Sequence, residues 1–196
     1  MGLVKKILDY ALRHPVFTVE DLRTYLDVDR NTLSVILNYM VRKGKINRIF
    51  RGRYTVYRDP EFLAPYIYYP SYISIFYALH LYGVIEQVPR AIHVVTTRRP
   101  VSKELILFDE TIVFFRIKPE LFFGYQRRNI GSHTTLVATP EKALLDAIYF
   151  YGPSILEVGT IHLEELDPQR LLYYSKFFPK RIRKLIKRIV PSQKQV

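Results

Sequence analysis

The stretch NRIFRGRYTVY (Asn47–Tyr57) constrains the fold of this chain more than any other, because it has the form of a tight β-hairpin. Two short apolar runs flank the turn RGR, and a central glycine suits a three-residue loop. We expect strands at Lys45–Phe50 and Tyr54–Tyr57. The arginines Arg48, Arg51 and Arg53 place more positive charge on this hairpin than folding requires.

Two helical segments open the chain. Leu3, Ile7, Tyr10 and Ala11 recur at helical spacing and predict a helix over Gly2–Arg13, which the proline at position 15 ends. Thr18 then begins a second helix, with Asp21 three residues later in a capping-box-like arrangement.

A third helix is expected to begin at Asp29 or Asn31, to run to about Lys43 and to end at Gly44, where a left-handed residue is favoured. Its core face consists of Leu33, Ile36, Leu37 and Met40. Its opposite face is small and polar and carries Arg30, Asn31, Ser34, Val35, Asn38 and Arg42.

Helix, helix, turn, helix and hairpin is the order of a winged helix-turn-helix, and the short link at Asp27-Val28 fits that motif. Short polar side chains let a helix sit deep in the major groove of DNA and bond base edges there. From Arg30 to Arg58 the chain has eight Lys and Arg residues and no Asp or Glu. The absence of acids favours a surface that faces phosphates, with the hairpin as the wing. The alternative is a winged helix that contacts only protein.

The expected partner is therefore double-stranded DNA. The residues expected to contact it are Arg30, Asn31, Ser34, Asn38, Arg42, Lys45, Arg48, Arg51 and Arg53.

The net charge of +12 is unevenly distributed. Residues 1–64 carry +5, residues 65–175 carry −1, and residues 176–196 carry +8. The tail KFFPKRIRKLIKRIVPSQK is predicted to form a basic amphipathic helix, with Ile182, Leu185, Ile186 and Ile189 on its apolar side. Arg183 and Lys187 on the other side are candidates for a second DNA contact. A helix that only docks on the protein, or one that lies on an anionic membrane, remains an alternative.

Composition excludes several other classes. The chain has no cysteine, so disulfides and thiolate metal sites are ruled out. Lys5, Lys6 and Asp9 interrupt the first apolar pattern, so we expect no signal peptide. No apolar run reaches the roughly 18 residues of a membrane span, and we expect a cytoplasmic protein without a membrane span.

Residues 1–60 are expected to form the DNA-binding domain and residues 61–196 a second domain, with a basic helical tail at 176–196. The boundary DPEFLAPYIYYP (Asp59–Pro70) is rich in proline and aromatic residues. Its aromatic side chains could pack between the domains or form a platform for single-stranded nucleic acid.

The second domain is predicted to be mixed α+β, with an antiparallel or mixed sheet. Its expected helices begin at Ser71, ending at Gly83, and at Thr139-Pro140-Glu141, ending at Gly152-Pro153. The second of these buries a stripe of Ala143, Leu144, Ala147, Ile148 and Tyr151. Its expected strands are Ala91–Thr97, Leu105–Phe108, Thr111–Ile117 and Thr134–Val137, the middle two joined by a turn at Asp109-Glu110.

No motif for catalysis, cofactor binding or metal binding stands out. The five histidines lack metal-pair spacing, and no phosphate-binding glycine loop is present. A restriction-type nuclease would need an acid where Arg116 stands, two residues before Lys118. We therefore expect no enzyme, no cofactor and no metal, and keep a metal-dependent winged-helix nuclease and a protein-binding adaptor as alternatives.

Five stretches of the chain resemble the AbiEi family of antitoxin-type transcriptional regulators, which belong to type IV toxin–antitoxin systems of abortive infection. These stretches are the N-terminal helices with RGRYTVY, SYISIFYALHLYGVIEQ (Ser71–Gln87), VVTTRR (Val94–Arg99), RIKPELFFGY (Arg116–Tyr125) and ATPEKALLDAIYF (Ala138–Phe150).

The resemblance implies a repressor that binds DNA repeats upstream of its own operon through the winged helix. It also implies a C-terminal antitoxin domain, and a cognate toxin that is not bound directly. Two copies could bind one repeat, so both a monomer and a homodimer remain open. Carried over by position, the DNA-binding role falls on Arg30, Asn31, Ser34, Asn38, Arg42, Arg48, Arg51 and Arg53.

Overall fold

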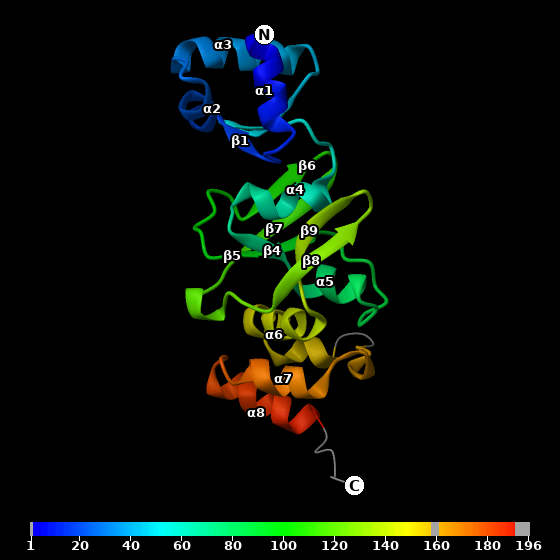
Figure 1. Cartoon of the computed structure of the whole chain (residues 1–196). Coiled ribbons are helices and arrows are strands. Elements are labelled where there is room, and N and C mark those ends of the chain that lie inside the picture. The colour runs from blue at the N-terminus through cyan, green and yellow to red at the C-terminus, as the bar shows by residue number, and fades with distance from the viewer. Residues whose placement is uncertain (1, 158–160, 191–196) are drawn as a thin grey trace.

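The computed structural model describes residues 2–157 and 161–190, and these form an α+β protein. Figure 1 shows an elongated molecule with an N-terminal region at one end, a large sheet in the middle and helices α6 to α8 at the other end. The elements of the N-terminal region are α1 (Leu3–Ala11), β1 (Phe17–Thr18), α2 (Val19–Leu26), α3 (Arg30–Arg42), β2 (Asn47–Phe50) and β3 (Arg53–Thr55).

The helix ends of this region follow from local side-chain chemistry. The hydroxyl of Thr18 accepts from the amide of Asp21, whose carboxylate accepts from the amide of Thr18, so the predicted capping box is confirmed. Asp29, and not Asn31, caps α3. Gly44 has a φ of +65°, and the amide of Lys45 bonds the carbonyl of Met40, which closes the helix as predicted.

The hairpin that follows α3 is tighter than expected. Arg53 pairs with Phe50, so the turn consists of Arg51 and Gly52 rather than three residues. A register shift between Arg48 and Phe50 takes up the extra residue in the strand. Strand β1, which the sequence did not predict, pairs with β3 and completes a three-stranded antiparallel sheet in the order β1-β3-β2.

The three helices and this sheet enclose one apolar cluster. Its buried members are Ile7, Ala11, Phe17, Leu22, Leu33, Leu37, Met40, Ile46 and Tyr54. Ile36, expected among the core residues of the third helix, is only half-buried and packs at the edge of this cluster.

The expected boundary segment contains a helix, α4 (Pro60–Ile67), which its prolines did not predict. Asp59 caps it, and Pro60 takes the first helical position, where a proline costs no hydrogen bond. Phe62 and Tyr68 are 8% exposed and belong to the large core cluster, so they offer no free platform for bases. Burial of apolar side chains has outweighed the helix-breaking character of Pro65.

A six-stranded mixed sheet forms the middle of the molecule, in the order β6-β7-β5-β4-β9-β8. Its β4–β9 and β5–β7 pairs are parallel and the other pairs are antiparallel. The strands are β4 (Ser71–Ile73), β5 (Ile92–Thr96), β6 (Glu104–Leu107), β7 (Glu110–Arg116), β8 (Tyr125–Ile130) and β9 (His133–Ala138).

Two predictions for this region were wrong. Ser71 does not cap a helix, because Ser71–Ile73 is the buried strand β4 and helix α5 (Ile75–Leu81) begins only after Ser74. The turn between β6 and β7 consists of Phe108 and Asp109, both at positive φ, so Glu110 is already in the strand. Strand β8 was not predicted at all.

Helices cover both faces of this sheet. The hydroxyl of Ser71 bonds the carbonyl of Pro65 in α4, whereas the hydroxyl of the next residue, Tyr72, bonds Asp146 in α6 (Pro140–Tyr151). Successive side chains of a strand point to opposite faces, so α4 and α6 lie on opposite sides of β4.

Helix α6 begins where it was predicted to begin. Its cap Thr139 accepts from the amide of Lys142, and Ala143, Leu144, Ala147 and Ile148 are buried. Tyr151, expected in the same stripe, is 46% exposed because it lies in the last turn, at the end of the helix.

The same helix buries charged groups that periodicity did not predict. The ammonium of Lys142 forms an ion pair with Asp146, and both side chains are fully buried. Tyr72 and Ser74 complete the cluster through hydrogen bonds to Asp146 of 3.1 and 2.8 Å. Burial lowers the pKa of Lys142 and raises that of Asp146, while their mutual attraction opposes both changes.

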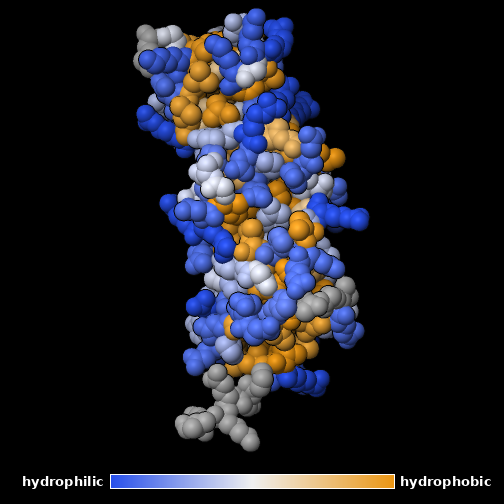
Figure 2. All heavy atoms as spheres, turned by 90° about the vertical axis from the view of Figure 1, so that its right-hand side faces the viewer, coloured by the Kyte–Doolittle hydropathy of each residue, from blue (hydrophilic) through white to orange (hydrophobic). Residues whose placement is uncertain are grey.

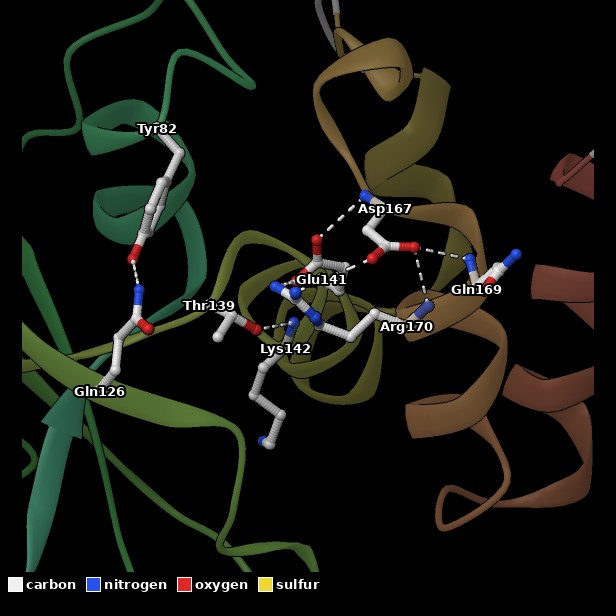
Figure 3. A network of polar contacts seen from close by, with 8 residues as sticks. All are labelled: Tyr82, Gln126, Thr139, Glu141, Lys142, Asp167, Gln169 and Arg170. Carbon is white, nitrogen blue, oxygen red and sulfur yellow. Dashed lines mark hydrogen bonds and ion pairs between the residues drawn. The ribbon is translucent and has the colours of Figure 1, made fainter.

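Helices α7 (Pro168–Ser175) and α8 (Lys180–Ile189) pack beyond α6. Figure 3 shows how α6 holds α7: the carboxylate of Glu141 accepts from the amide of Asp167 at 3.0 Å and faces the guanidinium of Arg170 at 3.6 Å. Short 3₁₀ segments at Pro119–Leu121, Pro153–Glu157 and Leu163–Glu165 link the longer elements. Glu164 and Glu165 lie in the last of these, and Asp167 caps α7.

Of the predicted basic tail, residues 180–189 form α8, and residues 191–196 lie outside the described residues. Ile182 and Ile186 are buried, and Leu185 and Ile189 are half-buried against the same cluster. Within the described residues, no helix is long and apolar enough to cross a membrane.

Candidate nucleic-acid interface

The outer face of α3 presents short polar and apolar side chains to solvent. Arg30, Asn31, Asn38 and Arg42 are exposed, and Val35 between them is 67% exposed. Tyr39, which was not among the predicted contact residues, is 44% exposed on the same face. Tyr39 follows Val35 by four residues, and this helical spacing could have predicted that the two side chains share one face.

Asp29 fixes the start of this face. Its carboxylate accepts from the amides of Asn31 and Thr32, each at 2.9 Å. Hydrogen bonds from Thr32 lower the pKa of Asp29, so the cap stays ionised. These first amides of α3 are therefore already bonded and are not free to hold a phosphate.

Ser34 is placed differently from its neighbours. Its hydroxyl is half-buried and donates to the carbonyl of Arg30 at 2.7 Å. With its proton used inside the helix, Ser34 can only accept a hydrogen bond from another molecule.

The hairpin is joined to α3 by Arg48. Its Nη2 atom donates to Oδ1 of Asn38 at 2.5 Å and to the hydroxyl of Tyr54 at 3.3 Å. The guanidinium also lies 5.4 Å from the centre of the Tyr54 ring. These contacts bring a predicted base-reading residue and a predicted phosphate-binding residue together on one surface.

Arg51 and Arg53 are not equivalent. Arg51 is exposed in the turn, beside Gly52, whose φ of +79° permits the reversal. Arg53 is half-buried, and its guanidinium lies 5.4 Å from the ring of Phe50 and 5.9 Å from that of Tyr68. Since Tyr68 directly follows α4, Arg53 lies at the junction with the rest of the molecule and not in the turn.

The positive charges of this surface are not neutralised internally. None of the described Lys and Arg residues between Arg30 and Arg58 forms an ion pair with a described acid. Lys45, just after α3, is exposed as well.

The predicted contacts of the tail lie far from this surface. Figure 1 places α8 at the opposite end of the molecule from α3. Lys187 is exposed there and Arg183 is half-buried. The structure therefore brings together the predicted residues of α3 and the hairpin, but not those of α8.

Hydrophilic side chains are distributed along the whole face drawn in Figure 2, with apolar patches between them.

No three histidine or acidic side chains lie close enough to hold a metal ion within residues 2–157 and 161–190. Arg116 ends strand β7, and Lys118 pairs loosely with Glu120 at 4.0 Å.

Residues 5–57 match the family model described as "Transcriptional regulator, AbiEi antitoxin". The match covers α1 through the hairpin, and the four resembling stretches of the C-terminal region lie outside it. No curated protein matches the chain at a significant level. Over residues 5–57, this chain is therefore similar to AbiEi antitoxin transcriptional regulators.

Proposed function

We propose that the chain is a sequence-specific DNA-binding autorepressor and the antitoxin of a type IV toxin–antitoxin operon. In this proposal residues 1–60 form a winged helix-turn-helix domain, and residues 61–196 form the domain that carries the antitoxin function. One observation carries the proposal: the outer face of α3 and the hairpin are joined by Arg48 and Asn38, and the stretch from Arg30 to Arg58 that forms them contains no Asp or Glu.

In the proposed complex, α3 enters the major groove. Asn31 and Asn38 offer amide groups to base edges, and the exposed Val35 suits the methyl group of thymine. Ser34 would accept a hydrogen bond from the exocyclic amino group of cytosine or adenine, since its own proton is used within the helix.

The basic residues around α3 would contact the DNA backbone. Arg30 and Arg42 lie at the two ends of the helix, and Lys45 follows it. Arg51 in the hairpin turn would act as the tip of the wing. Such phosphate contacts fix the register of the protein on DNA and do not themselves read sequence.

Arg53 would then have a different role from the one expected. Its half-buried position against Phe50 and Tyr68 suits an arginine that holds the hairpin to the C-terminal domain. A cation over an aromatic ring contributes about 0.5–2 kcal/mol, depending on how far it is desolvated.

Helix α8 would contact DNA independently of α3. Its apolar side is docked on the protein, and its exposed basic side carries no acid between Lys180 and Ile189. Because α8 lies at the other end of the molecule, it would engage a different stretch of DNA from the one that α3 reads.

The proposed operator is a set of repeats upstream of the chain's own operon, occupied by two copies. A single winged helix buries a modest area on DNA, so a second copy would supply both affinity and length of recognised sequence. The cognate toxin would be countered without a direct complex.

A promoter-reporter assay tests the proposal. The upstream region of the operon drives the reporter, and the chain is supplied from a second plasmid. Repression that is lost with Asn31→Ala/Asn38→Ala, at equal protein level, supports autorepression through α3. Repression that persists in this variant, or no repression by the original chain, contradicts it.

A further inference from the structure

A cavity of about 870 Å³ lies in the C-terminal region, far from α3. Its wall is formed by Phe76 at the start of α5, the loop that follows α5, His93 of β5 and Tyr151 at the end of α6. Its volume falls within the range of about 300–1,000 Å³ that is typical of small-molecule sites.

Two backbone contacts hold the wall together on the side of the loop. Ile85 forms a β-bridge with Ile161, and the amide of His162 donates to the carbonyl of Val84 at 2.8 Å. The loop that lines the cavity is thereby tied to a segment some 76 residues later in the chain, as is also seen in the contact of His162 with Glu86.

The apolar part of the wall is partly aromatic. The rings of Phe76 and Tyr151 lie 5.1 Å apart and are tilted to each other. Ile85, Ile155 and Ile161 complete the apolar lining. Such a surface favours a flat apolar body, because aromatic rings bind one another in offset or edge-to-face arrangements.

His93 provides a neutral polar group in this wall. It is 8% exposed, and burial lowers the pKa of its imidazole to about 4. Its Nδ1 atom has no hydrogen-bond partner among the described residues. This Nδ1 atom is itself closed off from solvent, so only the exposed edge of the imidazole is open to a ligand in the cavity.

Arg90 provides a positive charge in the same lining. It is exposed and forms no ion pair with any described acid. The nearby carboxylate of Glu86 faces His162 at 3.4 Å instead. Among the described residues, the lining therefore combines an apolar body, the neutral imidazole of His93, the guanidinium of Arg90 and the carboxylate of Glu86, which is engaged with His162.

We propose that this cavity binds a small aromatic anion, whose rings pack against Phe76 and Tyr151 and whose acidic group pairs with Arg90. A polar N–H or O–H group on the same ligand meets His93. This site does not rest on the proposed DNA-binding function, since it shares no residue with α3, the hairpin or α8.

A fluorescence titration tests the site with 8-anilinonaphthalene-1-sulfonate, which combines aromatic rings, one anionic group and one N–H donor. The full chain should bind this probe saturably, with a stoichiometry of one. Arg90→Gln should weaken binding about tenfold, which corresponds to the loss of one charge-assisted contact.

Arg99→Gln is the matched control, because Arg99 is also an exposed arginine of the C-terminal region but does not line the cavity. Its affinity for the probe should equal that of the original chain. Equal weakening in both variants, or unsaturable binding, would overturn the proposal.

Two further readouts locate the probe. The imidazole resonances of His93 should shift on addition of the probe, and the thermal midpoint of unfolding should rise, because a ligand of the native state stabilises it. An unchanged His93 signal at saturation, or a falling midpoint that indicates binding to unfolded chain, would also overturn the site.

Discussion

The guanidinium of Arg48 in β2 donates a hydrogen bond of 2.5 Å to the side-chain carbonyl of Asn38 in α3. This bond fixes the rotation of the Asn38 amide, so its NH₂ group points away from Arg48. The hairpin thereby determines which hydrogen-bonding groups α3 presents, although the two residues are ten positions apart in the chain.

Asn38→Ala should reduce discrimination at one base pair by roughly 1–3 kcal/mol, because a side chain that reads a base edge is lost. Binding to random DNA should change little. Affinity measured by fluorescence anisotropy on a set of single-base operator variants checks this result. Equal losses on specific and random DNA would show that Asn38 does not read a base.

Arg48→Ala and Asn38→Ala should not be additive in binding to the operator. Since Arg48 orients Asn38, a coupling of about 0.5 kcal/mol or more is expected from the double-mutant cycle. Strict additivity would mean that the bond between them does not matter in the complex.

Arg51→Ala should weaken binding to all sequences and lower the slope of log affinity against log salt by about 0.9, as the loss of one phosphate contact does. Arg53→Ala is the internal control, because its guanidinium is engaged with Phe50 and Tyr68. Its salt slope should stay unchanged. A reduced slope for Arg53→Ala, with no change for Arg51→Ala, would mean that Arg53 and not Arg51 contacts a phosphate.

Lys184→Gln/Lys187→Gln should lower the salt slope on long DNA by about 1.8 if both residues of α8 contact phosphates. On a short duplex that covers only the operator, the same variant should bind as the original chain does, because α3 and α8 lie at opposite ends of the molecule. An effect that is the same on both lengths of DNA would place α8 beside α3 in the complex.

Lys142→Met should destabilise the fold by about 3–5 kcal/mol, because it leaves the buried carboxylate of Asp146 without its cation. The double variant Lys142→Met/Asp146→Leu should recover much of that loss. Urea unfolding of the single and double variants measures both effects. A loss of stability below about 1 kcal/mol for Lys142→Met would mean that the ion pair is not buried in solution.

His93 should make stability depend on pH in the acid range. Its pKa is about 4 in the folded chain and about 6.5 when unfolded, so the unfolded chain binds the proton first as the pH falls. The free energy of unfolding should therefore decrease between pH 6.5 and about pH 4, by at most about 1.4 kcal/mol per pH unit.

His93→Gln should remove this part of the pH dependence, whereas His162→Gln should not. The pKa of His162 is raised by its hydrogen bonds to Glu164 and Glu86, so any contribution of His162 has the opposite sign. Chemical denaturation at several pH values distinguishes the two histidines. An identical pH profile for the original chain and His93→Gln would contradict the buried neutral state of His93.

Local signals predicted the parts of the fold that depend on a few neighbouring residues. The capping box of Thr18 and Asp21, the glycine at position 44 and the Thr139-Pro140 helix start each specify a helix end through contacts within one turn. These helix ends could be predicted because the residues that form each cap lie within a few positions of one another in the sequence.

The errors arose where distant residues decide the outcome. Ser71 has the side chain of a helix cap, but its hydroxyl bonds Pro65 and its backbone pairs with Thr96 of β5. Pro65 lies inside a helix because α4 packs on the sheet. In the sequence, Lys142 and Asp146 look like surface residues. Only the fold shows that the two side chains are buried together as an ion pair.

The candidate interface shows the same division. Exposure of Asn31, Val35, Asn38 and Arg42 follows from helical periodicity and was predictable. The bond from Arg48 to Asn38 and the burial of Arg53 depend on the register of the hairpin. This register shifts at a bulge between Arg48 and Phe50 that could not be predicted from the sequence.

Recognition of a specific DNA sequence by α3 and the hairpin underlies the proposed repression. The most direct test is the affinity of the purified chain for its own upstream DNA relative to random DNA of equal length, measured across a salt series. We predict a preference of at least roughly a thousandfold for the upstream fragment at physiological salt. Equal affinity for both DNAs at every salt concentration would contradict the claim and leave only non-specific attraction between a basic protein and DNA.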